Sequence, residues 1–386
     1  MIKILHFITD TNIGGAGNLL YQQIKGLDCQ KFSIYVALPH NSALIKKLSK
    51  LPCIIIKCKY GANTSFSMES MKENYQIIKK IRPDIVHSHG SLSSRIASTA
   101  LKIPCRIFTR HCAPQPPNLY KNPIVKYAFG ITNYLLSTKA IASAECAKQN
   151  LIEMGCNKEQ IVTIINGVPP CRILTDDEKA FLRAKYGLTK DNFIISYFAR
   201  IEKYKGHKTL LDAAKICKKY YPNFRFFIVG TGSFETKLKN YSNKIGISDI
   251  VHFTGFCEDV SPIFNITDIN VNCSYVSETA SLSLSEGMSL GIPSVVSNIG
   301  GNPYMIKNTV NGLVFPARNT DALAMALIRL YRDKELYKKC SHGALTRYQE
   351  ELNDKIMCKK MTEFYLREYK QSKSNNKKFK SLNIMR

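Results

Sequence analysis

Residues 2–27 of the chain read IKILHFITDTNIGGAGNLLYQQIKGL. The apolar run at Ile2–Ile8 has the length and the β-branched composition of a buried strand. It is followed by the sequence GGAG at 14–17 and then by a helical pattern from about Asn18 to Leu27. A strand that leads through a glycine turn into a helix is the opening unit of an α/β fold.

The same alternation continues to about residue 165. Short apolar runs separated by helical patterns predict further strands. Their expected positions are Phe32–Leu38, Ile54–Lys57, Ile85–His87, Arg106–Thr109, Ala140–Ser143 and Ile161–Ile165. Strands that alternate with helices in this way predict a parallel sheet with helices on both faces.

The pattern then pauses at Pro169-Pro170 and at the polar run TDDE at 175–178, and it restarts at residue 193. The strands expected after the pause are Phe193–Phe198, Arg225–Val229, Val251–Phe253, Ile269–Asn272, Ser294–Val296 and Gly312–Phe315. The pause predicts a linker between two doubly wound, Rossmann-like domains that face a central cleft, where ligands bind at the carboxyl ends of the strands. The expected divisions are an N-terminal domain 1–168, a linker 169–190, a C-terminal domain 191–350, a helix 351–370 that returns to the N-terminal domain, and a basic tail 371–386.

The composition is that of a globular protein, and the net charge indicates which classes of ligand the protein could bind. Of 386 residues, 45% are hydrophobic and 22% are charged, which excludes disorder over most of the length. The formal net charge is +26, and residues 1–170 and 171–386 each contribute +13. Such a surface attracts nucleic acid, acidic lipid headgroups or phosphorylated small molecules, and composition does not choose among them.

The cysteine pattern and the lengths of the apolar segments indicate in which cellular compartment the protein is expected. Thirteen cysteines occur without a C-x-x-C pair, which favours reduced, buried thiols over disulfides or a zinc site. No window of 18 uncharged apolar residues is present, and the N-terminus is too short in apolar residues for a signal peptide. We therefore expect a protein of the reducing cytoplasm that is either soluble or peripheral to a membrane.

Two basic residues and a glycine turn are candidate phosphate ligands. Arg200 follows the strand expected at 193–198, and Lys205 follows in the same loop. A diphosphate bound there would contact the planar guanidinium of Arg200 and the compact ammonium of Lys205. Solvated surface cations are the alternative. The GGAG turn at 14–17 suits an anion at a helix N-terminus, or it is simply a tight turn. It lacks the third glycine of G-x-G-x-x-G, which disfavours a dehydrogenase.

The stretch 277–293, SETASLSLSEGMSLGIP, is the most informative. Glu278 and Glu286 are the only charged residues in it. A helix that begins near Ser281 places one glutamate before its N-terminus and the other within it, with free backbone amides available for phosphate. Carboxylates on an apolar helix are costly unless they bind something, and a carboxylate that accepts from a vicinal diol is suited to holding a ribose.

These residues resemble the signature of retaining family 4 glycosyltransferases (glycosyltransferases group 1), which have the GT-B fold. The similarity runs in order from about residue 2 to residue 318. It rests on Glu278-x7-Glu286 with Gly291-x-Pro293, and on GG at 14–15, DIVHSH at 84–89, TRH at 109–111, INGV at 165–168, Arg200-x4-Lys205-Gly206, VGTG at 229–232 and FTGF at 253–256.

The resemblance implies a role for each candidate. Glu286 would bind the ribose of a nucleotide sugar, Glu278 the transferred sugar, and Arg200 and Lys205 the diphosphate, while His111 would line the sugar pocket. Further donor contacts are implied for Gly14, Gly15, Gly230, Cys257, Ser281 and Leu282. The family's donors are UDP- or GDP-sugars and no other cofactor is implied. Its acceptors are glycans, often lipid-linked, in bacterial surface polysaccharide synthesis (O-antigen, capsule or lipopolysaccharide).

Some features depart from the family or from metal-dependent transferases. Thr279, Ser281 and Ser283 stand where glycine and proline are frequent, which bears on donor identity. No D-x-D sequence occurs, so we expect no metal and no metal-dependent mechanism. His87 and His89 at a strand end are interpreted as structural.

Other functions stay open on the sequence alone. A nucleotide-sugar 2-epimerase shares the architecture, a basic nucleic-acid-binding protein would use the charge, and a sugar-binding protein would keep the glycines. Basic residues are not interleaved with aromatics in a recognisable nucleic-acid module, and we expect no nucleic-acid partner. The basic, aromatic segment at 118–129, NLYKNPIVKYAF, is by itself more typical of a helix packed on its own core with a basic rim. Together with the net charge of +26, it predicts reversible electrostatic association with an anionic membrane surface at the cytoplasmic face of the inner membrane.

Overall fold

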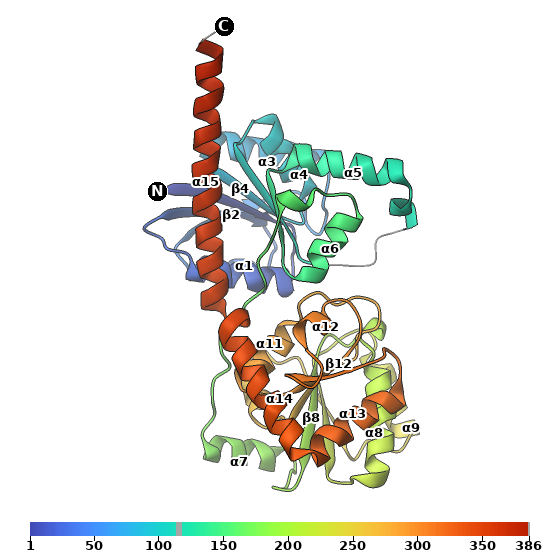
Figure 1. Cartoon of the computed structure of the whole chain (residues 1–386). Helices are drawn as coiled ribbons and strands as arrows, with labels where there is room; N and C mark the ends of the chain where they lie inside the picture. The colour runs from blue at the N-terminus through green and yellow to red at the C-terminus, as the bar shows by residue number, and fades with distance from the viewer. Residues whose placement is uncertain (113–117, 385–386) are drawn as a thin grey trace. The chain divides into compact units, whose positions relative to one another are not determined.

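The computed structural model describes residues 1–112 and 118–384, and the side chains of 375–384 lie outside that description. The chain divides into two compact units, one formed by Met1–Gly167 with Asp354–Arg386 and the other by Val168–Asn353. Each unit is a parallel sheet with helices around it (Figure 1). The predicted α/β class with two parallel-sheet units is therefore confirmed.

The first unit has a seven-stranded sheet in the order β3-β2-β1-β4-β5-β6-β7. Its strands are β1 Ile2–Ile8, β2 Phe32–Pro39, β3 Cys53–Cys58, β4 Ile85–His89, β5 Cys105–Arg110, β6 Lys139–Ala142 and β7 Ile161–Thr163. Its helices are α1 Gly15–Gly26, α2 Leu44–Leu48, α3 Met68–Ile81, α4 Leu92–Ala100, η1 Asn118–Lys121, α5 Pro123–Leu136, α6 Glu145–Glu153, η2 Lys158–Gln160 and α15 Asp354–Ile384.

The central strands of this sheet are covered on both faces. Every residue of β4 is buried, and β1 is buried from Ile4 to Ile8. Near-continuous burial is what a parallel strand between two helical layers requires, and it explains why these strands appear as apolar runs rather than as alternating patterns. Two of the helices begin at serine caps, since Ser67 accepts from the Ser70 amide and Ser91 from the Ser94 amide.

The second unit has a six-stranded sheet in the order β10-β9-β8-β11-β12-β13. Its strands are β8 Phe193–Phe198, β9 Phe224–Val229, β10 Val251–Gly255, β11 Ile269–Asn272, β12 Ser294–Ser297 and β13 Gly312–Phe315. Its helices are α7 Asp176–Lys185, η3 Lys203–Lys205, α8 His207–Tyr220, α9 Glu235–Lys244, α10 Ser261–Asn265, α11 Leu282–Ser289, α12 Asn302–Met305, α13 Thr320–Arg332, α14 Lys334–Arg347 and η4 Tyr348–Leu352.

The segment 169–190, expected as a linker, contains the helix α7 and belongs to the second unit. The polar run at 175–178 is a capping box: the Glu178 amide donates to the Thr175 side chain, and the Glu178 carboxylate accepts from the Thr175 amide. Thr175 and Glu178 therefore begin a helix rather than separate two domains.

Helix α15 is a continuous element of the first unit and runs through most of the segment expected as a tail. It contacts α1 and β5. The fully buried Tyr365 places its hydroxyl 2.6 Å from Nδ1 of His87 on β4. Gly26 at the end of α1 faces Cys358 so closely that a Cβ there would overlap the thiol.

The cysteines are reduced thiols, and most of them are buried. Within the described ranges, no helix is both long and apolar enough to cross a membrane.

We predict that Tyr365→Phe destabilises the protein by about 1–3 kcal/mol, because Nδ1 of the buried His87 loses its partner. Tyr369→Phe, one turn later on α15 and only partly buried, is the matched control and should leave stability unchanged. Urea unfolding followed by circular dichroism measures both variants. Equal midpoints for the two variants would show that the Tyr365–His87 hydrogen bond contributes nothing.

Candidate functional site

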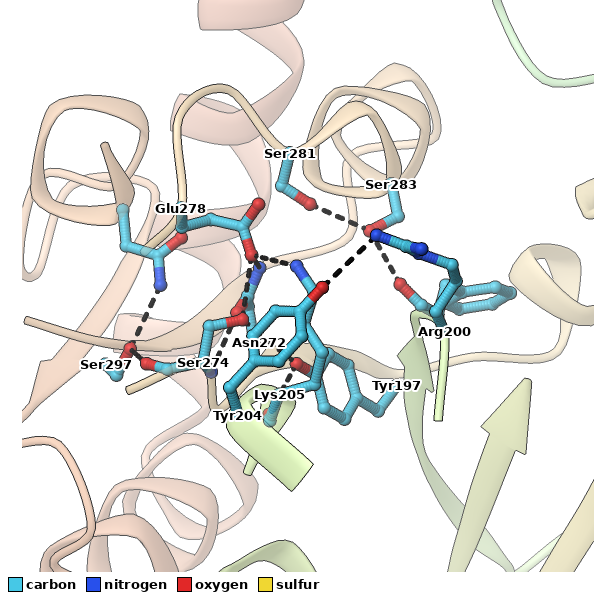
Figure 2. A network of polar contacts seen from close by, with 12 residues as sticks. Tyr197, Arg200, Tyr204, Lys205, Asn272, Ser274, Glu278, Ser281, Ser283 and Ser297 are labelled. Carbon is cyan, nitrogen blue, oxygen red and sulfur yellow. Dashed lines mark hydrogen bonds and ion pairs between the residues drawn. The ribbon is translucent and has the colours of Figure 1, made fainter. Parts of the chain in front are cut away.

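The centre of the site in the second unit is an ion pair between Lys205 and Glu278. Lys205 Nζ lies 2.7 Å from Glu278 Oε2, and the two side chains are only 16% and 12% exposed. The same carboxylate oxygen accepts from Ser274 Oγ at 2.7 Å and from Asn272 Nδ2 at 3.3 Å. Figure 2 shows these donors converging on one carboxylate. A sheltered charge pair is favourable only when further hydrogen bonds satisfy it, and here they do.

Two strand ends bring these residues together. Lys205 closes the short η3 turn after β8, whereas Asn272 ends the neighbouring strand β11 and Ser274 follows it. Gly206 has a φ of +75°, and a Cβ there would overlap the carbonyl oxygen of Cys273. Glycine at this position therefore permits the two loops to approach closely.

A network of buried hydroxyl groups holds the loops that surround the Lys205–Glu278 pair. Tyr197 on β8 is fully buried and donates its hydroxyl to the carbonyl of Lys205 at 2.7 Å. The same hydroxyl lies 3.3 Å from Ser274 Oγ, and Ser297 Oγ donates to the Ser274 carbonyl at 2.5 Å (Figure 2). The loop that carries Ser274 is therefore anchored to both β8 and β12.

Arg200 lies next to this network, and its guanidinium donates to the hydroxyl of Tyr204 at 3.2 Å. The adjoining loop carries Ser281, whose Oγ is 3.0 Å from Oγ of Ser283, which in turn bonds to the Phe198 carbonyl at 3.1 Å. Figure 2 shows the Arg200 side chain and both serines around the same space. Two cations and two hydroxyls in one place suit a charged, oxygen-rich ligand.

Helix α11 begins directly after Ser281, as expected, and carries Glu286. Ser281 makes no side-chain cap, so the amides of the first turn remain available near Leu282. Burial raises the pKa of Glu286 to about 7, with a smaller contribution from the neighbouring carboxylate of Asp259. No hydrogen bond to the Glu286 carboxylate is found among the described residues. A buried carboxylate with a shifted pKa and no protein partner is typical of a ligand-binding group.

Gly230 and Cys257 occupy the turns that follow β9 and β10. Gly230 has a φ of +135°, a Cβ there would overlap the Ala199 carbonyl oxygen, and its amide donates to Gly255 at 2.9 Å. The Cys257 thiol lies 3.7 Å from Thr254 Oγ1. These contacts fix the backbone of both turns.

The candidates of the first unit are Gly14, Gly15 and His111. A Cβ built on either glycine meets nothing within 4 Å, so the start of α1 faces open space. His111 Nε2 is 2.9 Å from His89 Nδ1, and burial lowers the pKa of His111 to about 4. His111 is therefore a neutral imidazole near neutral pH.

His6, His87 and His89 form a buried group whose nitrogens lie within 4.8 Å of one another. Both nitrogens of His87 are already bonded, to Tyr365 and Thr109, at 2.6 and 2.7 Å. Both nitrogens of His89 contact other histidines. Burial holds the pKa of all three well below the usual range. This bonding agrees with a structural role, and the absence of a bound metal stays a prediction.

The structure brings Lys205, Glu278 and the supporting loop together and sets Arg200 beside them. Sequence reasoning missed the residues that orient them, namely Tyr197, Tyr204, Asn272, Ser274 and Ser297. A signal for two of them was present. Asn272 and Ser274 are polar residues at the carboxyl end of a buried strand, where ligand-binding groups of α/β sheets gather.

Comparison with known proteins identifies the family and agrees with the observed fold. Residues 178–347 match the family model "Glycosyl transferases group 1", and residues 13–172 match "Glycosyltransferase Family 4". A UDP-Gal:alpha-D-GlcNAc-diphosphoundecaprenol alpha-1,3-galactosyltransferase of Escherichia coli is 27% identical over 346 residues, which is 87% of this chain and 89% of the relative.

Two solved structures have the same fold. A glycosyltransferase from Rickettsia africae ESF-5 superposes with a TM-score of 0.83 at 23% identity, covering 97% of this chain and 99% of that one. Anabaena HepE in complex with UDP-glucose gives 0.78 at 18% identity, covering 95% and 99%.

The two parallel-sheet units and the two family matches define a two-domain α/β transferase. The chain belongs to the group 1, family 4 glycosyltransferases of the GT-B fold. The resemblance inferred from the sequence motifs is thereby confirmed.

The raised pKa of Glu286 predicts a pH-dependent stability. Because the pKa of Glu286 is higher in the folded than in the unfolded chain, the carboxyl group adds most to the free energy of unfolding below pH 4.5, where it is protonated in both states. This contribution is lost as the pH rises to about 7 and the buried group must ionise. Glu286→Gln should therefore match the wild type at low pH and exceed it above pH 7, by at most about 3 kcal/mol.

Thermal unfolding of both proteins across this pH range, without ligand, measures the difference. A constant difference between wild type and Glu286→Gln at every pH would contradict the shifted pKa.

Proposed function

We propose that the protein transfers a sugar, with retention of anomeric configuration, from a UDP- or GDP-sugar to a hydroxyl of a glycan acceptor. The observation that carries this proposal is the sheltered Lys205–Glu278 pair with Arg200 beside it. It is followed in the chain by Glu286, whose buried carboxylate has no hydrogen-bond partner in the part of the chain that the structure describes. Cations for a diphosphate and carboxylates for sugar hydroxyls are the groups that a nucleotide sugar requires.

In this mechanism, cleavage of the bond between anomeric carbon and phosphate oxygen leaves negative charge on the diphosphate. Arg200 and Lys205 stabilise that charge, and they contribute most in the transition state, where the charge has grown. Glu278 shares its carboxylate with Lys205, so it orients this cation and accepts from a hydroxyl of the transferred sugar. The acceptor attacks from the face that the diphosphate leaves, and a departing phosphate oxygen takes the acceptor proton.

The remaining candidates bind the donor. Glu286 accepts from the ribose hydroxyls, the amides around Ser281 and Leu282 bind phosphate with help from Gly14 and Gly15, and the base rests near Gly230 and Cys257. The neutral imidazole of His111 contacts the transferred sugar. A protonated Glu286 loses acceptor capacity, so donor affinity should weaken below pH 7.

The reaction is proposed to need no metal ion. Metal-dependent transferases hold Mg²⁺ or Mn²⁺ on the diphosphate with paired carboxylates, and the sequence has no D-x-D pattern to do so. Arg200 and Lys205 supply the positive charge instead.

The proposed setting is bacterial surface polysaccharide synthesis, as O-antigen, capsule or lipopolysaccharide. The E. coli relative acts on a sugar linked to diphosphoundecaprenol, which supports a lipid-linked acceptor here. We further propose that the enzyme is cytoplasmic and associates reversibly with an anionic membrane, because its net charge is +26 and its acceptor would lie at the membrane surface.

A nucleotide-sugar 2-epimerase is the second candidate, since the same diphosphate and sugar ligands serve that reaction. Formation of a glycosylated acceptor separates the two activities, because an epimerase needs no acceptor.

We predict that Arg200→Ala and Glu286→Ala each lower transfer by at least about 100-fold while the fold is kept, the scale at which a transition-state contact is lost. Lys203→Ala is the matched control, because Lys203 lies in the same loop but is exposed. Turnover with radiolabelled UDP- and GDP-sugars and a glycolipid acceptor measures all three. Near-normal turnover in either of the first two variants would remove that residue from the mechanism.

We also predict that transfer survives excess EDTA, since the side chains that neutralise the diphosphate are cationic. The same assay with EDTA, and again with Mg²⁺ or Mn²⁺ restored, measures this. A strict requirement for either ion would rule out the metal-free mechanism.

A further inference from the structure

Helix α5 of the first unit exposes most of its large apolar side chains to solvent. Five large apolar residues on it are at least 41% exposed, and Leu119 in the preceding turn is 64% exposed. The five are Ile124 at 77%, Tyr127 at 71%, Ile131 at 41%, Tyr134 at 59% and Leu135 at 58%. Their spacing of three or four residues sets them along one side of the helix (labelled in Figure 1).

The side of α5 that faces the protein combines apolar and polar contacts, since the partly buried Phe129 packs against a buried apolar cluster of the first unit. Asn133 is the one buried residue of this fully described helix. Its amide accepts from Arg95 Nη2 at 2.7 Å, and Arg95 also donates to Ser137 at 3.0 Å. Gly130 lies so close to Gly155 that a Cβ on it would overlap the carbonyl oxygen. The hydrogen bonds and the close backbone contact fix α5 in place and leave its apolar face outward.

This arrangement departs from the usual pattern of a surface helix, because five large apolar side chains of α5 lie exposed on one side. In α8, for example, the buried residues include Leu210, Leu211 and Ala214, and the lysines face water. Exposed apolar side chains that occur singly need no explanation, but a continuous stripe of them marks an interaction surface.

The charge around the stripe indicates the kind of partner. The 60 residues from 85 to 144 contain seven lysines and arginines and no aspartate or glutamate. Two of these cations, Lys121 and Lys126, are exposed at the N-terminal end of α5. An apolar helical face with isoleucine, leucine and tyrosine, bordered by lysine and free of acidic residues, has the composition of helices that lie in the interface of anionic membranes.

We propose that the outward face of α5, together with Leu119, is the surface by which this protein docks on an anionic lipid bilayer. The apolar side chains enter the boundary between headgroups and acyl chains, and Lys121 and Lys126 contact the headgroup phosphates. A second copy of the chain fits the surface less well, because two copies would bring the same positive charges together. The inference deepens the proposed membrane association by naming its surface, and it rests on that proposal.

The test uses the full-length protein and four variants. Ile124→Ser/Tyr127→Ser/Tyr134→Ser removes the apolar face, and Lys121→Glu/Lys126→Glu reverses the charge. Phe181→Ser/Met325→Ser is the matched control, since these apolar residues of the second unit are 75% and 65% exposed. Leu345→Ser, at 36% exposure, is a second control outside the first unit.

Co-sedimentation is measured with vesicles of phosphatidylcholine alone and of phosphatidylcholine mixed with phosphatidylglycerol, at low and high salt. We expect the wild type and both controls to bind the anionic vesicles, and the α5 triple variant to bind at least about tenfold more weakly at either salt concentration. The charge variant should lose most of its binding at low salt. Equal binding by the triple variant and the wild type would overturn the proposal.

Two further readouts separate this inference from its alternatives. Thermal stabilisation by UDP or by GDP should be the same in the wild type and in every variant. A wild type that binds anionic vesicles but is stabilised by neither nucleotide would count against the catalytic proposal alone. Light scattering should show the same mass for wild type and triple variant. A wild-type dimer that the triple variant abolishes would assign α5 to self-association and overturn membrane docking.

Discussion

The second unit depends on one sheltered ion pair, Lys205–Glu278, for the arrangement of its candidate site. Removing either partner would leave a largely buried charge, a change that typically costs about 3–5 kcal/mol. Asn272 and Ser274 satisfy the carboxylate, and Tyr197 holds the Lys205 carbonyl, so the loops after two adjacent strands are fixed together. The contacts that lower the cost of burying this pair also hold it at the carboxyl ends of β8 and β11, where we propose that the donor binds.

Close backbone approaches make this arrangement possible. Gly206 meets the Cys273 carbonyl and Gly300 meets the backbone of Glu278, and neither position has room for a Cβ. The Gly301 amide donates to the Glu278 carbonyl at 2.9 Å. Glycine thus serves packing between loops here, whereas Gly14 and Gly15 adjoin open space where a ligand can approach.

In the first unit, buried polar groups hold helices against the sheet and against one another. Its core contains a chain of histidines held neutral by burial, with Tyr365 bonded to His87, and its helix α5 is attached through Asn133 and Arg95. Buried polar groups must be paired, so they specify how helices dock more strictly than apolar contacts do. In α5 this pairing leaves the apolar face free for a partner.

The sequence by itself determined the α/β class, most strand positions and the family, because strand length, glycine turns and motif spacing are local properties. It also singled out Lys205 and Glu278, which the structure brings together, although their roles in binding stay predictions. It did not reveal that the polar run at Thr175 begins α7, since a linker and a capped helix start with the same residue types. Only the tertiary structure decided that Asn272, Ser274 and Tyr197 hold Lys205 and Glu278 together, and that α5 faces outward. These features depend on which strands become neighbours in the sheet and on which face of a helix packs against the core. Both are set by contacts between residues far apart in the sequence, so local sequence patterns do not reveal them.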